Sequence, residues 1–161
     1  MFETRDSFRR AFLDMIGNKD NAYHPLVWIN GEPEIGPGTY IGGFSEVNTG
    51  NARVTIGADC DIASFVAINA ADSHRRAIGI SDELEYCDII IGDNVFIGSH
   101  CAILGGADIG HHSVIGAGTI VRAQHIPPFS LVVGNPMIVR EEYYRAEYEA
   151  RHGESTGDDP T

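Results

Sequence analysis

The stretch IGDNVFIGSHCAILGGADIGHHSVIGAGTIV, residues 91–121, decides the fold, because a large aliphatic residue returns at every sixth position. A helix of 3.6 residues per turn would scatter these side chains around its axis, and a simple strand would alternate with a period of two. The six-residue period predicts a coil of short strands instead. The whole series of aliphatic residues comprises Ile29, Ile35, Ile41, Val47, Ile56, Ile62, Ile68, Ile91, Ile97, Ile103, Ile109, Ile115 and Val121.

Two further positions of each six-residue unit support this coil. Two residues before the aliphatic stands a small or β-branched side chain such as Val54, Cys60, Cys101 or Thr119, as a narrow interior requires. Glycine usually follows the aliphatic, and we expect it to supply the backbone conformation that a corner needs. Three units would then complete one triangular coil, with strands stacked about 4.8 Å apart.

The segments IGDNVFIGSH (91–100) and GGADIGHHSVIGAGTIVRAQHIPPFSLVVGNPMIVR (105–140) closely resemble the C-terminal coils of hexapeptide-repeat acyltransferases. That family includes galactoside, maltose, serine and xenobiotic acetyltransferases. The resemblance implies an all-β fold, a left-handed parallel β-helix of hexapeptide repeats over residues 29–140. It also implies acetyl-CoA as the acyl donor and a homotrimer whose active sites lie between subunits.

The flanks of the repeat region differ in composition from the repeats. Residues 1–28 predict a helix and a lead-in, with Phe8, Phe12 and Met15/Ile16 on one face that packs against an end or side of the prism. Residues 141–161 predict a short C-terminal helix over 141–151 and a disordered acidic tail after it.

The composition narrows the classes of partner and the cellular location. The net charge of −12 opposes nucleic acid and anionic membranes as partners. The chain has no apolar run long enough for a membrane span and no signal-like start. Its three cysteines lack metal spacing and fit reduced thiols, so we expect a cytoplasmic protein. Cys101 occupies a small inward position, where core packing is a better explanation than a nucleophile.

The repeat breaks off at NAADSHRRAIG, residues 69–79, and an inserted loop runs over residues 70–87. Relatives place their catalytic histidine in such a loop, so the resemblance implies that His74 is the general base. A neutral imidazole has a pKa near 6.5 and can accept the proton of an attacking hydroxyl or amine. A carboxylate of the loop should orient the ring, and Asp72, Glu83 and Glu85 are the candidates, with Asp72 nearest in sequence.

The resemblance also implies where the donor binds. The corresponding positions are the cofactor-binding candidates Ser99, Gly116, Ala117, Arg122 and Arg140. The two arginines would pair with phosphates, because a guanidinium binds phosphate through two parallel hydrogen bonds.

The acceptor site is predicted from polar residues near the loop, namely Asn69, Arg75, Arg76 and Glu46. Maltose and galactoside enzymes carry an acceptor-contacting asparagine before a phenylalanine of an early coil. Here Gly43 precedes Phe44, which argues against free galactosides or maltose.

These observations predict an acetyl-CoA-dependent acetyltransferase that acts on a hydroxyl or amine of a nucleotide-linked or surface-polysaccharide sugar. Serine or an antibiotic is the alternative acceptor. Two other classes stay open, a zinc lyase of the gamma-carbonic-anhydrase type and a non-catalytic β-helix scaffold. The zinc enzymes need an H-x4-H spacing, and no two histidines here are five residues apart.

Overall fold

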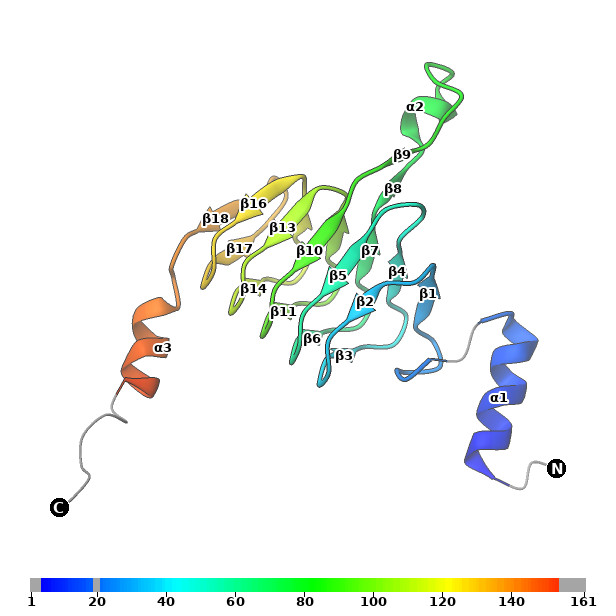
Figure 1. Cartoon of the computed structure of the whole chain (residues 1–161), viewed down its shortest axis with the longest axis horizontal. Coiled ribbons are helices and arrows are strands. Elements are labelled where there is room, and N and C mark those ends of the chain that lie inside the picture. The colour runs from blue at the N-terminus through cyan, green and yellow to red at the C-terminus, as the bar shows by residue number, and fades with distance from the viewer. Residues whose placement is uncertain (1–3, 19–20, 154–161) are drawn as a thin grey trace.

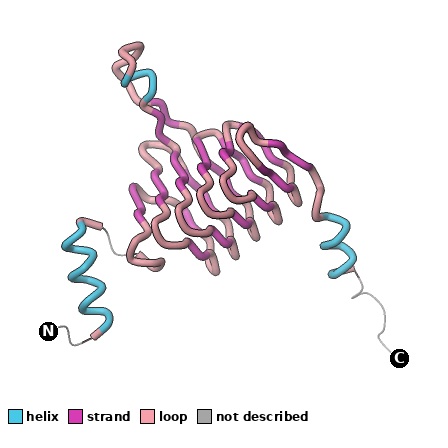
Figure 2. Tube along the Cα trace, turned by 180° about the vertical axis from the view of Figure 1, so that it is seen from behind, coloured by secondary structure: helices cyan, strands magenta, loops and turns pink. Residues whose placement is uncertain are grey.

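The computed structural model describes residues 4–18 and 21–153, and within them the chain winds into a parallel β-helix (Figure 1, Figure 2). Successive strands pass in turn to the three sides of a triangular prism. The first sheet contains β1 (Trp28–Asn30), β4 (Glu46–Asn48), β7 (Ala67–Asn69), β12 (Ala102–Leu104) and β15 (Ile120–Val121). The second contains β2 (Glu34–Ile35), β5 (Val54–Ile56), β10 (Ile89–Ile91), β13 (Ala107–Ile109) and β16 (Gln124–Ile126).

The third sheet ends in a strand that reverses direction. It contains β3 (Tyr40–Ile41), β6 (Asp61–Ile62), β11 (Phe96–Ile97), β14 (Val114–Ile115), β17 (Leu131–Val133) and the antiparallel β18 (Ile138–Arg140). The predicted class, a left-handed parallel β-helix of hexapeptide repeats with short terminal helices, is confirmed.

Columns of aliphatic side chains fill the interior of the prism. Ile68 lies in register with Val47 on one side and Ile103 on the other, and each of the three is at most 1% exposed. Burial of one such side chain stabilises the fold by about 1.5–3 kcal/mol. The predicted second inward position is also confirmed, since Cys60, Cys101 and Thr119 are buried.

On the second and third sheets, the glycine that follows most of the aliphatics serves close packing between coils, and our expectation of a corner conformation there is wrong. A Cβ atom at Gly42 or Gly98 would lie 2.6 Å from a backbone nitrogen of the next coil. The left-handed conformation falls two residues later, at Phe44 and His100 among others, with φ of 64° and 61°. The glycine is therefore needed because no side chain fits between stacked backbones.

The N-terminal helix α1 (Arg5–Ile16) begins with a capping box between Thr4 and Ser7 and ends at Gly17 in the left-handed conformation. The predicted helix is present, but its predicted apolar face is not buried. Phe8 and Met15 are 53% and 77% exposed, whereas Leu13 is buried. Phe12 and Ile16 are half-buried, so only part of the expected face packs, together with Leu13, which that face did not include.

The C-terminal helix α3 (Arg145–His152) is shorter than the predicted span 141–151, because residues 141–144 form a turn. Tyr148 of α3 packs on Phe129 and His112, with ring centroids 5.1 and 4.6 Å apart. His112 is half-buried beneath the helix. The predicted disordered tail lies outside the described residues from residue 154 onward.

An arm interrupts the prism at the corner between the first and second sheets and projects away from it (Figure 1). Its two sides are the antiparallel strands β8 (Ala71–Asp72) and β9 (Glu85–Tyr86), and α2 (His74–Ala77) lies between them. The arm closes where the Cys87 amide donates to the Ala70 carbonyl at 3.0 Å. The chain then re-enters the next coil at β10.

In the part of the chain that the structure describes, no helix combines the length and the apolar character needed to cross a membrane.

Substituting Gly98 with alanine tests the packing role of the repeat glycine. We expect Gly98→Ala to lower the free energy of unfolding by about 1–3 kcal/mol in chemical denaturation, because the added methyl meets the backbone of Ala117. Gly116→Ala is the matched control, since its methyl would meet only the movable Val133 side chain at 3.0 Å. Equal losses for the two variants would contradict this explanation.

Candidate active site

His74 and Asp72 form a hydrogen-bonded pair at the base of the arm. The Nδ1 atom of His74 lies 2.7 Å from Oδ1 of Asp72, and the same oxygen accepts the His74 backbone amide at 2.9 Å. An ionised carboxylate can only accept, so a neutral imidazole carries its proton on Nδ1 and its lone pair on Nε2. That arrangement presents Nε2 as a base.

The two hydrogen bonds from His74 also act on the carboxyl group. The backbone amide of His74 and then its ring hold the pKa of Asp72 below its usual value. Of the three candidate carboxylates, the structure pairs Asp72 with the imidazole. Glu85 forms an ion pair with Arg75 at 3.2 Å.

The predicted acceptor-binding residues Arg75, Arg76 and Glu46 lie in different surroundings. Arg75 binds Glu85 within the arm, so its guanidinium is engaged in holding β9 to α2. Arg76 is exposed on α2. Glu46 lies on the outer face of the first sheet and accepts from the Asn30 amide at 2.9 Å.

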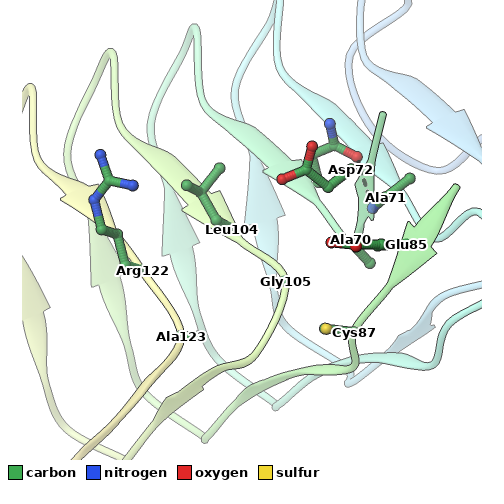
Figure 3. Close-up of a pocket in the computed structure, with 10 residues that line it drawn as sticks. Ala70, Ala71, Asp72, Glu85, Cys87, Leu104, Gly105, Arg122 and Ala123 are labelled. Atoms are coloured by element: carbon green, nitrogen blue, oxygen red, sulfur yellow. Dashed lines mark hydrogen bonds between the residues drawn. The ribbon is translucent and has the colours of Figure 1, made fainter. Parts of the chain in front are cut away.

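A cavity of about 260 Å³ lies where the arm meets the prism (Figure 3). Asp72 and Glu85 line it from the arm, and Arg122 lines it from the other side. Its floor consists of small or apolar residues, which are Ala70, Ala71, Cys87, Leu104, Gly105 and Ala123. Asn69 completes the wall beside the arm. Of the Asp72–His74 pair, Asp72 lines the cavity and His74 does not, so the cavity lies next to the pair and has Arg122 as its cationic side.

Asn69 belongs to a column of outward-facing residues at this corner. Asn48 pairs in register with Asn69, and Asn69 pairs with Leu104. Since Ile103 pairs with Val121, the next residue in the column is Arg122. Asn48 and Asn69 use their Oδ1 atoms to accept the amides of Gly50 and Ala71, at 3.1 Å each. Their amide groups are therefore held in fixed orientations along the edge.

The residues predicted to bind the acyl donor lie at three places. Ser99, Gly116 and Ala117 lie together at the corner between the third and first sheets, where the Gly118 amide donates to the Ser99 carbonyl at 2.9 Å. Arg122 lies at the other end of β15, in the cavity. Within one chain, the structure does not bring Arg140 to this group.

Arg140 ends β18 on the third sheet and pairs in register with Leu131. A ligand that touched both Ala117 and Arg122 would extend along the outer face of β15.

Cys101 and His125 also carry groups that could act in catalysis, but each is engaged by a neighbouring residue. Cys101 is buried and donates to the Gly116 carbonyl at 3.1 Å, and burial raises the pKa of its thiol. A thiol held protonated is a poor nucleophile. His125 pairs with Asp108 at 2.7 Å on the exposed face of the second sheet, away from the residues that line the cavity.

Among the described residues, no three His, Cys, Asp or Glu side chains are gathered closely enough to bind a metal ion.

Comparison with known proteins identifies the family. Residues 88–123 match the family described as "Bacterial transferase hexapeptide (six repeats)". Galactoside O-acetyltransferase of Escherichia coli (strain K12) is 32% identical over 156 residues, covering 91% of this chain and 75% of that protein. The chain belongs to the hexapeptide-repeat acetyltransferase family.

Other members of this family match over shorter regions. The Staphylococcus aureus (strain COL) protein SACOL2570, named as an acetyltransferase, is 43% identical over 72 residues. That match covers 45% of this chain and spans about a third of the relative, 34% of its length.

Solved structures of two transferases share the fold. Galactoside acetyltransferase in complex with coenzyme A superposes with a TM-score of 0.68 at 30% identity, covering 91% of this chain and 76% of that one. AntD, an N-acyltransferase from Bacillus cereus in complex with dTDP and 3-hydroxybutyryl-CoA, gives a TM-score of 0.64. It covers 83% of this chain and 76% of that one, and its 19% identity shows the fold alone.

Sequence reasoning missed part of the cavity wall. Glu85 was considered only as a partner for His74, and Leu104 and Cys87 were not considered as lining residues. Leu104 could have been found from the six-residue repeat, because it follows Ile103 as Asn69 follows Ile68. Cys87 could not, because its position depends on how the arm closes.

The titration of Asp72 tests the geometry of the pair. We expect its carboxyl to titrate below the ordinary aspartate pKa of about 3.9 in carbon-13 NMR. The ionised Asp72 carboxylate then stabilises the folded protein above the ordinary pKa of aspartate. This contribution to the free energy of unfolding is lost as the pH falls through the lowered pKa. His74→Ala should raise the pKa of Asp72 only part of the way to its ordinary value. The backbone amide of residue 74, which is the larger cause of the lowering, remains in the variant. An ordinary pKa in the unmodified protein would contradict the pairing.

Proposed function

We propose that this protein is an acetyl-CoA-dependent acetyltransferase that acts on a hydroxyl or amine of a sugar, with His74 as the general base. The observation that carries the proposal is the Asp72–His74 pair beside a cavity that Arg122 lines from the opposite side. The pair supplies a base with a defined free nitrogen. The arginine supplies a cation for the phosphates of a donor that reaches the same cavity.

The chemistry is a direct transfer. The acceptor hydroxyl or amine attacks the thioester carbonyl carbon while Nε2 of His74 removes its proton, and a tetrahedral intermediate forms. Backbone amides stabilise the oxyanion. The intermediate collapses with cleavage of the carbon–sulfur bond, and the proton held by His74 passes to the departing coenzyme A sulfur. Asp72 keeps the ring oriented and stabilises the imidazolium that forms between these two steps.

A sugar is the acceptor class that the site and the relatives favour. The fixed amides of Asn48 and Asn69 stand beside the arm, where their NH2 groups can donate to acceptor oxygens. Galactoside O-acetyltransferase matches over 91% of this chain. Gly43 stands where that family's sugar enzymes have an asparagine, so we infer a nucleotide-linked or surface-polysaccharide sugar, with serine and antibiotics as competing acceptors in a screen.

We also propose that the working form is a cytoplasmic homotrimer with the site between subunits. The arm carries Ile78 and Ile80 at 66% and 61% exposure, although both are large aliphatic residues. The His74 side chain is itself 60% exposed. A neighbouring copy packed against the arm would cover the two isoleucines and close the site around the acceptor.

An acceptor screen that follows coenzyme A release tests the proposal, together with His74→Ala. We expect the variant to lose about 10²–10⁴ in kcat, because a positioned base contributes that much. His125→Ala is the matched control, since His125 makes a similar 2.7 Å contact with Asp108 outside the cavity. Full activity of His74→Ala would show that His74 is not the base. Equal losses of kcat in both variants would show that the loss is not specific to the residue beside the cavity.

Alkylation of Cys87 tests where the donor lies. All three cysteines are described, and Cys87 is the exposed one, while burial raises the pKa of Cys60 and Cys101. We expect iodoacetamide to modify Cys87 first and acetyl-CoA to slow that reaction, because Cys87 and Arg122 line the same cavity. Cys87→Ser should abolish the fast phase. If acetyl-CoA left the rate unchanged, the donor would not occupy this cavity.

A further inference from the structure

A cluster of aromatic rings holds the C-terminal helix α3 to the last coils of the prism. Tyr148 of α3 packs on His112 and Phe129, with ring centroids 4.6 and 5.1 Å away. His112 and Phe129 stack on each other at 5.0 Å, and His152 stacks on Tyr148 at 4.2 Å. The half-buried ring of His112 therefore lies between an aromatic side chain of the coils and one of the helix.

The helix depends on this ring cluster for its stability. An isolated helix as short as the eight residues of α3 is not stable in water, and no residue of α3 is fully buried. At its start the Tyr144 amide donates to the Phe129 carbonyl at 3.0 Å, and the Arg145 guanidinium lies 4.6 Å from the centre of the Phe129 ring. Helical structure over residues 145–152 therefore reports whether the ring cluster is intact.

His111 and His112 are joined by a hydrogen bond that limits how many protons the pair can carry. Their Nδ1 atoms lie 2.8 Å apart, so one of them donates and the other accepts. The pair can hold one positive charge in this arrangement, with the charged ring as donor. When both rings are charged, both Nδ1 atoms carry a hydrogen, and the hydrogen bond is replaced by repulsion between two cations.

The surroundings of His112 also disfavour its charged form. Its pKa is lowered, first by burial and then by the charge of His111, while His152 lowers it further and Asp93 raises it. Further charged or titratable side chains around the cluster belong to α3 or to the turn before it, and they are Glu142, Tyr144, Arg145, Glu147, Tyr148, Glu149 and Arg151.

The sign of the pH dependence follows from the direction of this shift. The pKa of His112 in the folded protein lies below the ordinary histidine value of about 6.5. The docked state of α3 is therefore fully stabilised above about pH 6.5, and that stabilisation is lost as the pH falls toward the lowered pKa.

We propose that the ring cluster is a pH-sensitive switch, which docks α3 at neutral pH and releases it when a second proton enters the His111–His112 pair. With both rings charged, His112 turns toward water, and Tyr148 loses a surface on which it packs. The released segment then loses its helical structure. This behaviour is separate from the proposed catalysis, because the cavity beside the arm is lined by other residues.

Carbon-13 NMR of the full chain tests the proposal. The Cα chemical shifts of residues 145–152 report helical structure and would be followed from about pH 7.5 to about pH 5.0, a range that spans the titration of histidine. We expect helical shifts at the upper end and a loss of at least about half of the helical displacement at the lower end, with a midpoint below about pH 6.5. Helical shifts that persist unchanged to the lower end would overturn the proposal.

The variant His112→Phe separates His112 from the other groups that titrate in this range. Phenylalanine keeps a ring between Tyr148 and the coil but carries no proton. The chain already holds Phe129 in the same left-handed backbone conformation, with φ of 60° against 57° at His112. We expect the variant to stay helical over residues 145–152 at low pH. A loss equal to that of the unmodified protein would place the cause in other groups and overturn the proposal.

Two further variants complete the test. His125→Phe replaces an exposed histidine of the second sheet and should respond to pH as the unmodified protein does. His111→Ala removes the second cation, so its midpoint should move to lower pH by about half a unit or more. If His112→Phe leaves α3 undocked even at neutral pH, His111→Ala decides the question, and an unchanged midpoint would overturn the proposal.

Discussion

The close approach of one coil's backbone to the next is the constraint on which the rest of the structure depends. At Gly42 and Gly98 the distance to the neighbouring coil leaves no space for even a Cβ atom. Backbone hydrogen bonds between coils can then form in register, such as that from Gly98 to Ile115 at 2.8 Å. Register in turn stacks Ile68 on Ile103 inside and Asn69 against Leu104 outside. The close approach of the stacked backbones thus sets both the packing of the interior and the alignment of side chains on the surface.

A prism built this way has flat sides and no cleft, so chemistry requires a departure from the repeat. The arm supplies it. Its strands β8 and β9 pair with each other, which holds Asp72 at the edge of the prism and leaves His74 at the start of α2. The backbone amide and ring of His74 both reach one oxygen of Asp72. The His74 ring is therefore oriented by a residue two positions away and does not rely on the core.

The regular coils contribute an ordered surface to this site. Because outward positions repeat with the strand spacing, side chains distant in sequence form a column whose chemistry changes stepwise from amide to aliphatic to cation. The same scaffold can present different side chains to a ligand by changing single members of the column, with the packing of the interior unaltered.

The six-residue period in the sequence determined the fold, the inward positions and the loop that carries His74, because stacking of identical coils leaves a direct trace in residue spacing. It could not choose among Asp72, Glu83 and Glu85, which differ little in sequence separation from the ring. Nor could it place Cys87 in the cavity wall, since that position lies in the arm, whose length is unrelated to the repeat. Those choices depend on how the arm folds back and closes at Ala70 and Cys87, and only the tertiary structure decided them.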